Sequence, residues 1–287
     1  MSILLTPATR AVVQGATGRI GGAQMRWMIE YGTQIVGGVT PGKGGETLFD
    51  RPVFDTVDEA VEKAGANATV IFVPAAYARD AALEAIDAKL DLVVFVPEHI
   101  PVRDTMTVKN FATEKGIKVV GPNAPGIISP GIGKLGIMPG NMFTPGRIGV
   151  ISRSGTLSYE VSGYMNEAGF GQSTMVGMGG DPVVCMPLES ILAEFEADKD
   201  TDAVVMVGEI GGSAEEAAAL YIKKMTKPVV CYIAGRSAPH DKKMGHAGAI
   251  IKAGQGTVES KRAALEAAGA KVAVNLSEIP HLLRKVL

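Results

Sequence analysis

The chain has 287 residues, of which 46% are hydrophobic, enough to bury a large core divided between two domains. Its 28 basic and 30 acidic residues give a formal net charge of -2 and are spread along the chain, which argues against nucleic acid as the main partner. No apolar run approaches membrane-spanning length, and the N-terminus lacks the features of a secretory signal. We therefore expect a soluble cytoplasmic protein that has no contact with a membrane.

The two cysteines, Cys185 and Cys231, stand in apolar stretches without the spacing of a disulfide framework or a zinc site. This usage is typical of a reducing compartment. We interpret both cysteines as structural and expect no metal site in this chain.

Short apolar runs alternate with amphipathic segments in the first half of the chain. The runs lie at residues 11–15, 34–39, 68–74, 90–97 and 118–122. Continuous apolar runs are typical of strands buried on both faces, and the segments between them have helical periodicity. Thr56 and Glu59 form a predicted capping box at the start of one such helix. The pattern predicts a parallel sheet with crossover helices.

A stretch rich in glycine and proline, residues 123–146, interrupts this alternation and marks a domain junction. The alternation then resumes, with predicted strands at residues 147–154, 173–179, 202–210, 228–235 and 271–275. Helices are expected to begin near Thr156, Pro187, Ser213, Thr257 and Ser277. The sequence therefore predicts two doubly wound α/β domains in tandem.

A glycine-rich turn, GATGRIG at residues 15–21, follows the first predicted strand. Its glycines let a phosphate approach backbone N–H groups at a helix N-terminus, although a plain strand-to-helix turn has the same pattern. Nicotinamide-binding domains carry an acidic residue at the end of the second strand, where this chain reads VTPGKGG at residues 39–45. Lys43 suits a ligand with an additional phosphate, such as CoA or NADP, unless it is only a surface lysine.

Two further motifs indicate anion chemistry in the second half. SRSGT at residues 152–156 follows a strand and opens a helix, so it offers N–H groups, hydroxyls and a helix dipole to an anion, or a simple N-cap. His246 lies in the small-residue loop MGHAGA, where its imidazole has room for a bulky anion. Of the four histidines, the remaining three are expected to be surface or capping groups: His99, His240 and His281.

Glu209 ends an apolar strand and is followed by glycines, a position from which a carboxylate can orient an imidazole by accepting its N–H. The other ring nitrogen of His246 would then be free to accept phosphate. The alternative is a capping or solvent-facing Glu209, since Ser213 and Glu216 have the spacing of a capping box.

Several long blocks in this order resemble the α subunits of succinyl-CoA synthetase and their relatives, malate–CoA ligase and the citryl-CoA-forming enzymes. The blocks include GATG, VGGVTPGKGG, GPN, GIMPG, ISRSGTLSYE, GGDP, GEIGGSAEE and MGHAGAI. The resemblance covers essentially the whole chain. It implies a Rossmann-like CoA-binding domain over residues 1–122, a connecting segment over residues 123–146 and a flavodoxin-like ligase domain over residues 147–287.

The resemblance also implies roles for single residues. His246 would be the transiently phosphorylated histidine and Glu209 its orienting carboxylate. The phosphate would be held at Ser154, Gly155 and Thr156, and the substrate carboxylate near Asn123 and Ser154. The implied CoA site consists of Thr17, Gly18, Arg19, Ile20, Val39, Lys43, Val73, Pro74, Val96 and Glu98.

In such a family the phosphohistidine gives its phosphoryl group to a small carboxylic acid, and the sulfur of CoA then attacks the acyl phosphate. ATP or GTP and Mg²⁺ would bind mainly on an ATP-grasp β subunit, because the chain has no Walker-type GxxxxGK(S/T) loop. We expect an αβ or α2β2 assembly that is inactive without the β subunit. The β subunit would add a second helix N-terminus facing the phosphohistidine.

The chain departs from the family at several positions. Ala124 stands where cysteine is usual, Pro97-Glu98-His99 replaces the common TEG sequence, and GGAQ continues the glycine turn. Residues 183–187 read VVCMP instead of a more polar segment, which extends the candidate acids from succinate to malate or a tricarboxylate such as citrate. Two other classes remain open: an NAD(P)-dependent oxidoreductase and a noncatalytic CoA-binding regulatory subunit.

Overall fold

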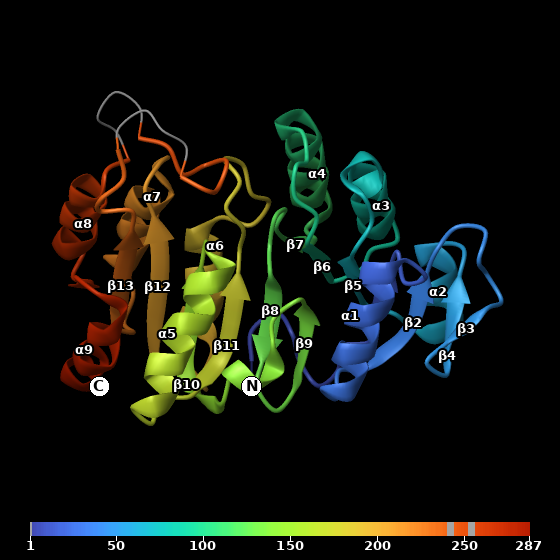
Figure 1. The fold of residues 1–287 in the computed structure, drawn as a ribbon, viewed down its shortest axis with the longest axis horizontal. Coiled ribbons are helices and arrows are strands. Elements are labelled where there is room, and N and C mark those ends of the chain that lie inside the picture. The colour runs from blue at the N-terminus through green and yellow to red at the C-terminus, as the bar shows by residue number, and fades with distance from the viewer. Residues whose placement is uncertain (1, 240–243, 252–255) are drawn as a thin grey trace.

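The computed structural model describes residues 2–239, 244–251 and 256–287. Within these residues the chain forms two α/β halves that lie side by side, each built around a seven-stranded sheet (Figure 1). The predicted surface histidines His99 and His281 are both exposed. The expectation for His240 concerns a position outside the described residues.

The first sheet has the strand order β3-β4-β2-β1-β5-β6-β7. Its strands are β1 (Ala11–Gln14), β2 (Ile35–Val39), β3 (Thr47–Leu48), β4 (Arg51–Phe54), β5 (Ala68–Ile71), β6 (Leu92–Phe95) and β7 (Lys118–Val120). All paired neighbours are parallel except β3 and β4. Without the short β3, the parallel strands have the chain order 3-2-1-4-5-6 of a dinucleotide-binding fold. The predicted Rossmann-like fold is confirmed.

The second sheet has the order β14-β13-β12-β10-β11-β8-β9. Its strands are β8 (Gly126–Ser129), β9 (Gly133–Gly136), β10 (Pro145–Ser152), β11 (Gln172–Gly177), β12 (Ala203–Glu209), β13 (Val229–Ala234) and β14 (Lys271–Ala273). The strands from β10 onward are parallel, in the order 2-1-3-4-5 of flavodoxin-like folds, and β8 and β9 pair antiparallel. The predicted flavodoxin-like arrangement is also confirmed.

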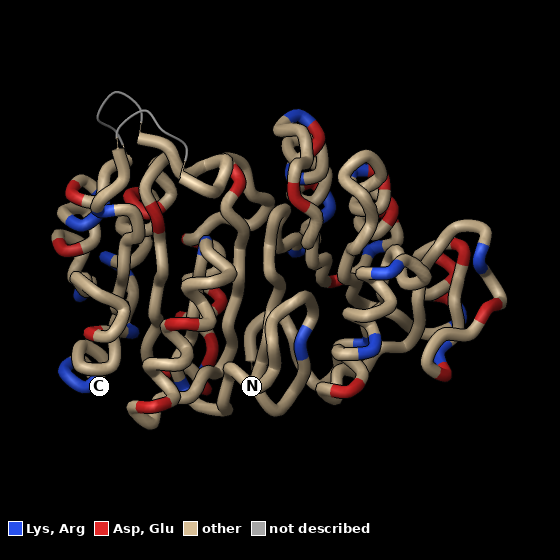
Figure 2. The backbone as a smooth tube through the Cα atoms, in the orientation of Figure 1, with Lys and Arg blue, Asp and Glu red and all other residues tan. Residues whose placement is uncertain are grey.

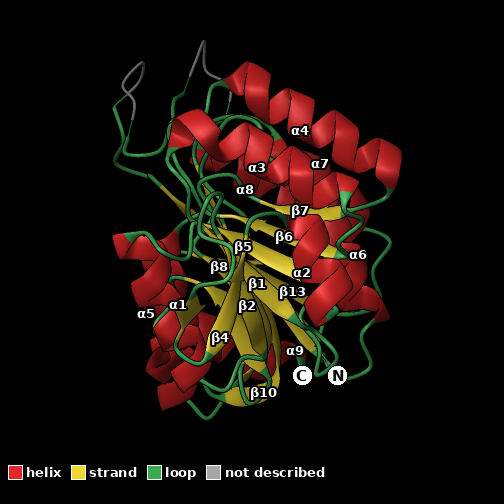
Figure 3. Cartoon of the chain, turned by 90° about the vertical axis from the view of Figure 1, so that its right-hand side faces the viewer, coloured by secondary structure: helices red, strands yellow, loops and turns green. Residues whose placement is uncertain are grey.

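Helices cover both faces of the sheets, for example α1 and α5 on one side and α3 and α4 on the other (Figure 3). The α-helices are α1 (Arg19–Glu30), α2 (Val57–Ala64), α3 (Ala75–Asp87), α4 (Val102–Lys115), α5 (Gly155–Glu167), α6 (Leu188–Ala197), α7 (Ala214–Ile222), α8 (Val258–Ala267) and α9 (Ile279–Val286). Short 3-10 turns lie at Gly140–Met142 and Leu276–Glu278. One buried apolar cluster contains residues of both halves, among them Val13 and Val204, so the halves share a core.

The segment over residues 123–146 differs from the loop-rich connection that its composition suggests, because it contains the β8–β9 hairpin. A Cβ atom at Gly126 would lie 2.0 Å from the carbonyl oxygen of Leu135, so glycine is required where the strands touch. The hairpin also contacts the first half: the Thr33 hydroxyl donates to the carbonyl of Lys134 and accepts from its N–H, both at 2.9 Å. The domain boundaries themselves stay a prediction.

Basic and acidic residues are interspersed along the chain (Figure 2). Among the described residues, no helix is long and apolar enough to cross a membrane, and no group of three His, Cys, Asp or Glu side chains is placed to hold a metal ion. Burial raises the pKa of Cys185 to about 12 and also raises the pKa of Cys231, so both thiols stay protonated and unreactive.

Candidate functional site

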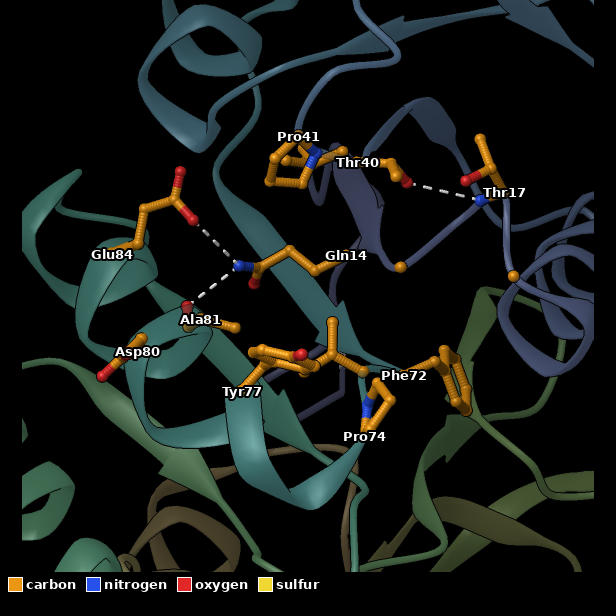
Figure 4. A pocket seen from close by; sticks show the side chains of 14 residues that line it. Gln14, Thr17, Thr40, Pro41, Phe72, Pro74, Tyr77, Asp80, Ala81 and Glu84 are labelled. Atoms are coloured by element: carbon orange, nitrogen blue, oxygen red, sulfur yellow. Dashed lines mark hydrogen bonds between the residues drawn. The ribbon is translucent and has the colours of Figure 1, made fainter.

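The first candidate site is a pocket of about 650 Å³ at the carboxyl ends of β1, β2 and β5 (Figure 4). This is the point where the strand order of a doubly wound sheet reverses, which is the usual ligand site of such sheets. Of the predicted CoA-site residues, the pocket is lined by Thr17, Gly18, Val39, Val73 and Pro74. The same edge of the sheet therefore brings half of the predicted set together.

The glycine turn in this pocket allows close contacts between backbone segments. Gly15 has a φ of 81°, and a Cβ there would lie 2.9 Å from the carbonyl oxygen of Phe72. A Cβ at Gly21 would lie 2.1 Å from the oxygen of Gly15, so helix α1 approaches the turn closely. Gly18 is the N-cap of α1, and no described side chain caps this end. The helix N-terminus thus faces the pocket with N–H groups suited to a phosphate.

The α3 side of the pocket is acidic, because Asp80 and Glu84 line it. The amide of Gln14 donates to the carbonyl oxygen of Ala81 at 2.9 Å and lies 3.5 Å from the Glu84 carboxylate (Figure 4). Burial raises the pKa of Glu84, although the hydrogen bond that its carboxylate accepts from the Val57 N–H lowers the pKa in part. A ligand that enters this pocket meets apolar walls and, on the α3 side, hydrogen-bond acceptors.

Other predicted CoA-site residues lie around or outside this pocket. Arg19 and Ile20 form the first turn of α1 directly after Gly18. Lys43 is half exposed and pairs with Glu46 at 3.1 Å, in a loop whose Gly44 N–H donates to the Asp55 carboxylate at 2.9 Å. Val96 packs against the core shared by the two halves, and Glu98 lines a different pocket beside His246.

The second candidate site joins His246 to Glu209. The Nδ1 atom of His246 lies 2.7 Å from Oε2 of Glu209, at the end of β12. Glu209 is only 7% exposed, so the solvent-facing alternative for this residue is wrong. A carboxylate accepts hydrogen bonds, which keeps the proton on Nδ1 and leaves the lone pair on Nε2.

Close packing fixes the imidazole from the other side. A Cβ at Gly180 would lie 2.3 Å from the ring of His246, so only glycine allows this position. The hydrogen bond to Glu209 raises the pKa of His246; burial and Arg153 oppose this rise, while Asp181 adds to it. His246 is therefore held in one orientation by a charged partner, as a nucleophilic histidine requires.

A pocket of about 250 Å³ beside His246 is lined from both halves of the chain. It brings together His246, Asn123, Glu98 and Val183. The side-chain amide of Asn123 donates to the Asp181 carboxylate at 3.0 Å. The predicted substrate residue Asn123 and the predicted nucleophile thus share one cavity, and Val183 brings in the segment that departs from the family.

Ser154, Gly155 and Thr156 form the start of α5, and the Ser154 hydroxyl accepts from the N–H of Leu157 at 3.3 Å. Strand β10 leads into this helix and pairs in parallel with β12, with Ser152 opposite Val207. The start of α5 therefore lies at the same sheet edge as Glu209. Ser154 is therefore the N-cap of α5, and its hydroxyl accepts one of the N–H groups at the start of this helix.

Charged residues outside the predicted set of site residues surround Glu209. Arg153 lies 3.3 Å from Glu209 and 3.1 Å from Glu215, and Lys261 pairs with Glu215. Glu216 pairs with Lys261 at 3.2 Å, and Ser213 makes no side-chain cap, so the predicted Ser213–Glu216 capping box is wrong. The only signal in the sequence is the position of Arg153 inside the SRSGT motif, because its partners come from distant segments.

Comparison with known proteins identifies a family for each half of the chain. Residues 6–99 match the family described as CoA binding domain, and residues 151–271 match the family described as CoA-ligase. The α subunit of the ADP-forming succinate–CoA ligase of Methanothermobacter thermautotrophicus is 56% identical over 285 residues, which cover 99% of this chain and 97% of that protein. The corresponding α subunit of Aquifex aeolicus is 51% identical over 290 residues, with 100% and 95% covered.

Among solved structures, ATP citrate lyase from Methanothrix soehngenii in complex with citrate and coenzyme A superimposes with a TM-score of 0.89 and 22% identity. The match covers 99% of this chain but 50% of that longer chain, and it shows a common fold. The identity to the α subunits, in contrast, exceeds half of all positions along nearly the whole chain. The chain therefore belongs to the family of the α subunits of ADP-forming succinate–CoA ligases.

Proposed function

We propose that the chain acts as the α subunit of an ADP-forming acid–CoA ligase in which His246 carries a phosphoryl group from a nucleotide to a small carboxylic acid. The observation that carries this proposal is the 2.7 Å hydrogen bond between Nδ1 of His246 and the buried carboxylate of Glu209. This bond supports a nucleophile at Nε2, because Nδ1 keeps its proton throughout.

Each step exchanges one bond at phosphorus or carbon. Nε2 of His246 attacks the γ-phosphorus of ATP, an N–P bond forms, and the bond to the departing ADP oxygen breaks. A carboxylate oxygen of the acid then attacks the same phosphorus, which breaks the N–P bond and yields an acyl phosphate. The sulfur of CoA then attacks the acyl carbon, so that a C–S bond forms and the C–O bond to phosphate breaks. Inorganic phosphate leaves with the thiol proton. Ser154, Gly155 and Thr156 would stabilise the phosphoryl group through the start of α5.

The residues around the first pocket fit CoA. The turn that contains Thr17 and Gly18 would hold the diphosphate against the N–H groups of Arg19 and Ile20, because glycines there let a ligand approach the backbone. Val39, Val73 and Pro74 would form the apolar wall. Lys43 would pair with a further phosphate, and Val96 and Glu98 would lie along the path toward His246.

The acid is proposed to be succinate, as the names of the relatives suggest, with Asn123 near its carboxylate. The nucleotide and Mg²⁺ are proposed to bind on an ATP-grasp β subunit in a cytoplasmic αβ or α2β2 assembly. The membership of the chain in a family of α subunits supports a partner subunit, and the lack of a Walker-type loop in the sequence supports a nucleotide site on that partner.

The experiment is co-expression of the chain with its β subunit, followed by assays of ATP- and CoA-dependent thioester formation with succinate, malate and citrate. We expect thioester and ADP in equal amounts with wild type, and neither with His246→Asn. CoA binding without thioester formation for any acid would favour a noncatalytic regulatory subunit. Hydride transfer to NAD(P) without thioester formation would favour an oxidoreductase.

A further inference from the structure

The carboxylate that holds His246 belongs to a buried row of alternating charges. Arg153, directly after β10, lies between Glu209 of β12 and Glu215 of α7, and Lys261 of α8 pairs with the other carboxylate oxygen of Glu215. Exposure is 7% for Glu209 and 6% for Arg153, and Glu215 and Lys261 are fully buried. Four elements thus place four charged groups in a row behind the imidazole.

The charges in this row cancel without any contribution from His246. Two carboxylates, Glu209 and Glu215, face two cations, Arg153 and Lys261, while Glu216 contacts Lys261 from the half-exposed edge. A buried carboxylate without a cation takes its countercharge from any titratable neighbour, which here is the imidazole. A protonated imidazole has no lone pair on Nε2 and cannot attack phosphorus.

We propose that Arg153 is a positioning residue of the ligase reaction, an inference that rests on the function proposed above. By bridging Glu209 and Glu215, Arg153 supplies positive charge to Glu209 and so favours the uncharged form of His246 that attacks phosphorus. Glu215 and Lys261 hold the guanidinium in place. Arg153 itself touches neither phosphate nor acid in this role and acts through Glu209.

The geometry of the guanidinium supports this role. Nη2 of Arg153 lies 3.3 Å from Oε1 of Glu209, and Nη1 lies 3.1 Å from Oε1 of Glu215, so one rigid fork spans two carboxylates. A Cβ at Gly248 would lie 3.0 Å from Nη2, so the backbone of the histidine loop packs directly on the guanidinium. Oε1 of Glu209 is buried and has no hydrogen-bond partner among the described residues, so Arg153 acts on it through charge.

Opposing charges around His246 agree with this assignment. The hydrogen bond and charge of Glu209 raise the pKa of His246, and Asp181 adds to the rise. Burial and the positive charge of Arg153 lower it. Arg153 therefore limits the rise that Glu209 would otherwise cause.

The test compares Glu215→Gln with the paired change Arg153→Met and Glu215→Gln in the αβ complex. Removing Arg153 alone leaves two buried carboxylates with one cation and threatens folding, whereas the paired change keeps the row neutral. The amide oxygen that Glu215→Gln introduces can still accept the hydrogen bond that Glu215 accepts from the N–H of Glu209, at 3.1 Å in wild type. The readout is the midpoint of the acid limb for His246 phosphorylation by ATP, together with a ¹⁵N NMR titration of the His246 ring.

We expect the paired variant to raise both midpoints by about one pH unit, because Glu209 then has His246 as its nearest cation. Phosphorylation at pH 7 should fall by up to roughly tenfold for a shift of this size. Glu215→Gln alone keeps Arg153 beside Glu209, and its midpoints should equal or fall below those of wild type. Arg153→Lys keeps the positive charge but loses the forked guanidinium, so its midpoints should lie between those of wild type and the paired variant.

The two readouts separate this inference from the proposed function. A titration midpoint that is unchanged in both the paired variant and Arg153→Lys would overturn the role of Arg153, even if both complexes take phosphate. A wild-type complex whose His246 titrates normally but takes no phosphate from ATP at any pH would overturn the proposed function instead.

Discussion

His246 and Glu209 lie 37 positions apart in the sequence, yet Nδ1 of the imidazole and Oε2 of the carboxylate are 2.7 Å from each other. Strand β12 ends at Glu209. The loop that contains His246 lies against the same edge of the sheet, where the N–H of Gly248 donates to the carbonyl oxygen of Gly180 at 3.1 Å. The carboxyl ends of neighbouring parallel strands meet at one edge, so residues from different connections can converge there.

Glu209→Gln removes the charge that orients the imidazole and leaves a side chain of nearly the same shape. We expect the rate of His246 phosphorylation in the αβ complex to fall by roughly 10²-fold or more, the scale on which orienting carboxylates act on catalytic histidines. The measurement is rapid-quench labelling with γ-labelled ATP. Unchanged labelling would mean that Glu209 has no part in orienting the nucleophile.

The pH dependence follows from the pKa of His246, which the hydrogen bond to Glu209 raises above the ordinary histidine value of about 6.5. The neutral imidazole is the nucleophile, so the acid limb of the phosphorylation rate should have its midpoint above that value. The contribution of the His246–Glu209 pair to the free energy of unfolding should instead decrease as pH rises. It should be fully present below the unfolded pKa and lost as pH rises through the folded pKa.

Two measurements check this sign: the labelling rate between pH 5.5 and 9, and the difference in Tm between wild type and Glu209→Gln over the same range. The Tm difference should shrink toward high pH. A difference that grows with pH would contradict a raised pKa for His246.

Gly180→Ala places a Cβ atom 2.3 Å from the ring of His246 and should displace the imidazole from Glu209. We expect phosphorylation to fall by roughly 10²-fold, because small displacements of reacting groups are that costly. The matched control is Gly163→Ala on α5, where an added Cβ meets no atom within 4 Å. That change should leave labelling intact and stabilise the helix by about 0.5–1 kcal/mol, as measured by urea unfolding.

Lys43→Met tests the proposed contact with an additional phosphate of CoA. Because Lys43 is half exposed, we expect a loss of about 1 kcal/mol, or about fivefold in Kd, that diminishes with added salt. Calorimetry with CoA and with dephospho-CoA separates the contacts, since the second ligand lacks the 3′-phosphate and should bind both proteins equally. Glu46→Gln removes the ion-pair partner of Lys43 and should not weaken the binding of CoA. Equal losses for both ligands would place Lys43 elsewhere in the site.

Lys261→Met should destabilise the chain strongly, because Lys261 is fully buried against Glu215. Breaking such a pair from one side costs about 3–5 kcal/mol. Adding Glu215→Gln should recover much of this loss, since Arg153 and Glu209 then remain as a neutral pair. Urea unfolding of wild type, the two single variants and the double variant measures the coupling between Lys261 and Glu215. Additive losses would show that the row of charges does not act as a unit.

The fold was predictable where continuous apolar runs mark buried strands. The run at residues 68–74 contains β5, and the run at residues 202–210 contains β12, with only the ends trimmed. The hairpin of β8 and β9 was not predictable, because the glycines that its close strand contact requires resemble a loop. Of the predicted capping box, the Thr56 half forms, with its hydroxyl accepting from the N–H of Glu59 at 3.2 Å. The Glu59 carboxylate accepts from the N–H of Asp55 instead of that of Thr56.

At the site, the sequence could identify His246 and Glu209, since an imidazole among small residues and a carboxylate at a strand end both carry local signals. It could not identify Arg153, Glu215 and Lys261 as partners. Arg153 and Glu215 are 62 positions apart, and nothing in the local pattern shows that two buried carboxylates need the same guanidinium. Glu216 pairs with Lys261 and does not form the predicted capping box with Ser213.

The most direct test of the account follows one phosphoryl group through the αβ complex. The complex is labelled on His246 with γ-labelled ATP, separated from nucleotide, and then mixed with succinate and CoA. We predict that the label leaves His246 as inorganic phosphate together with an equal amount of succinyl-CoA, and that His246→Asn takes no label. Thioester formation by a complex whose His246 never carries the label, or by His246→Asn itself, would contradict the account.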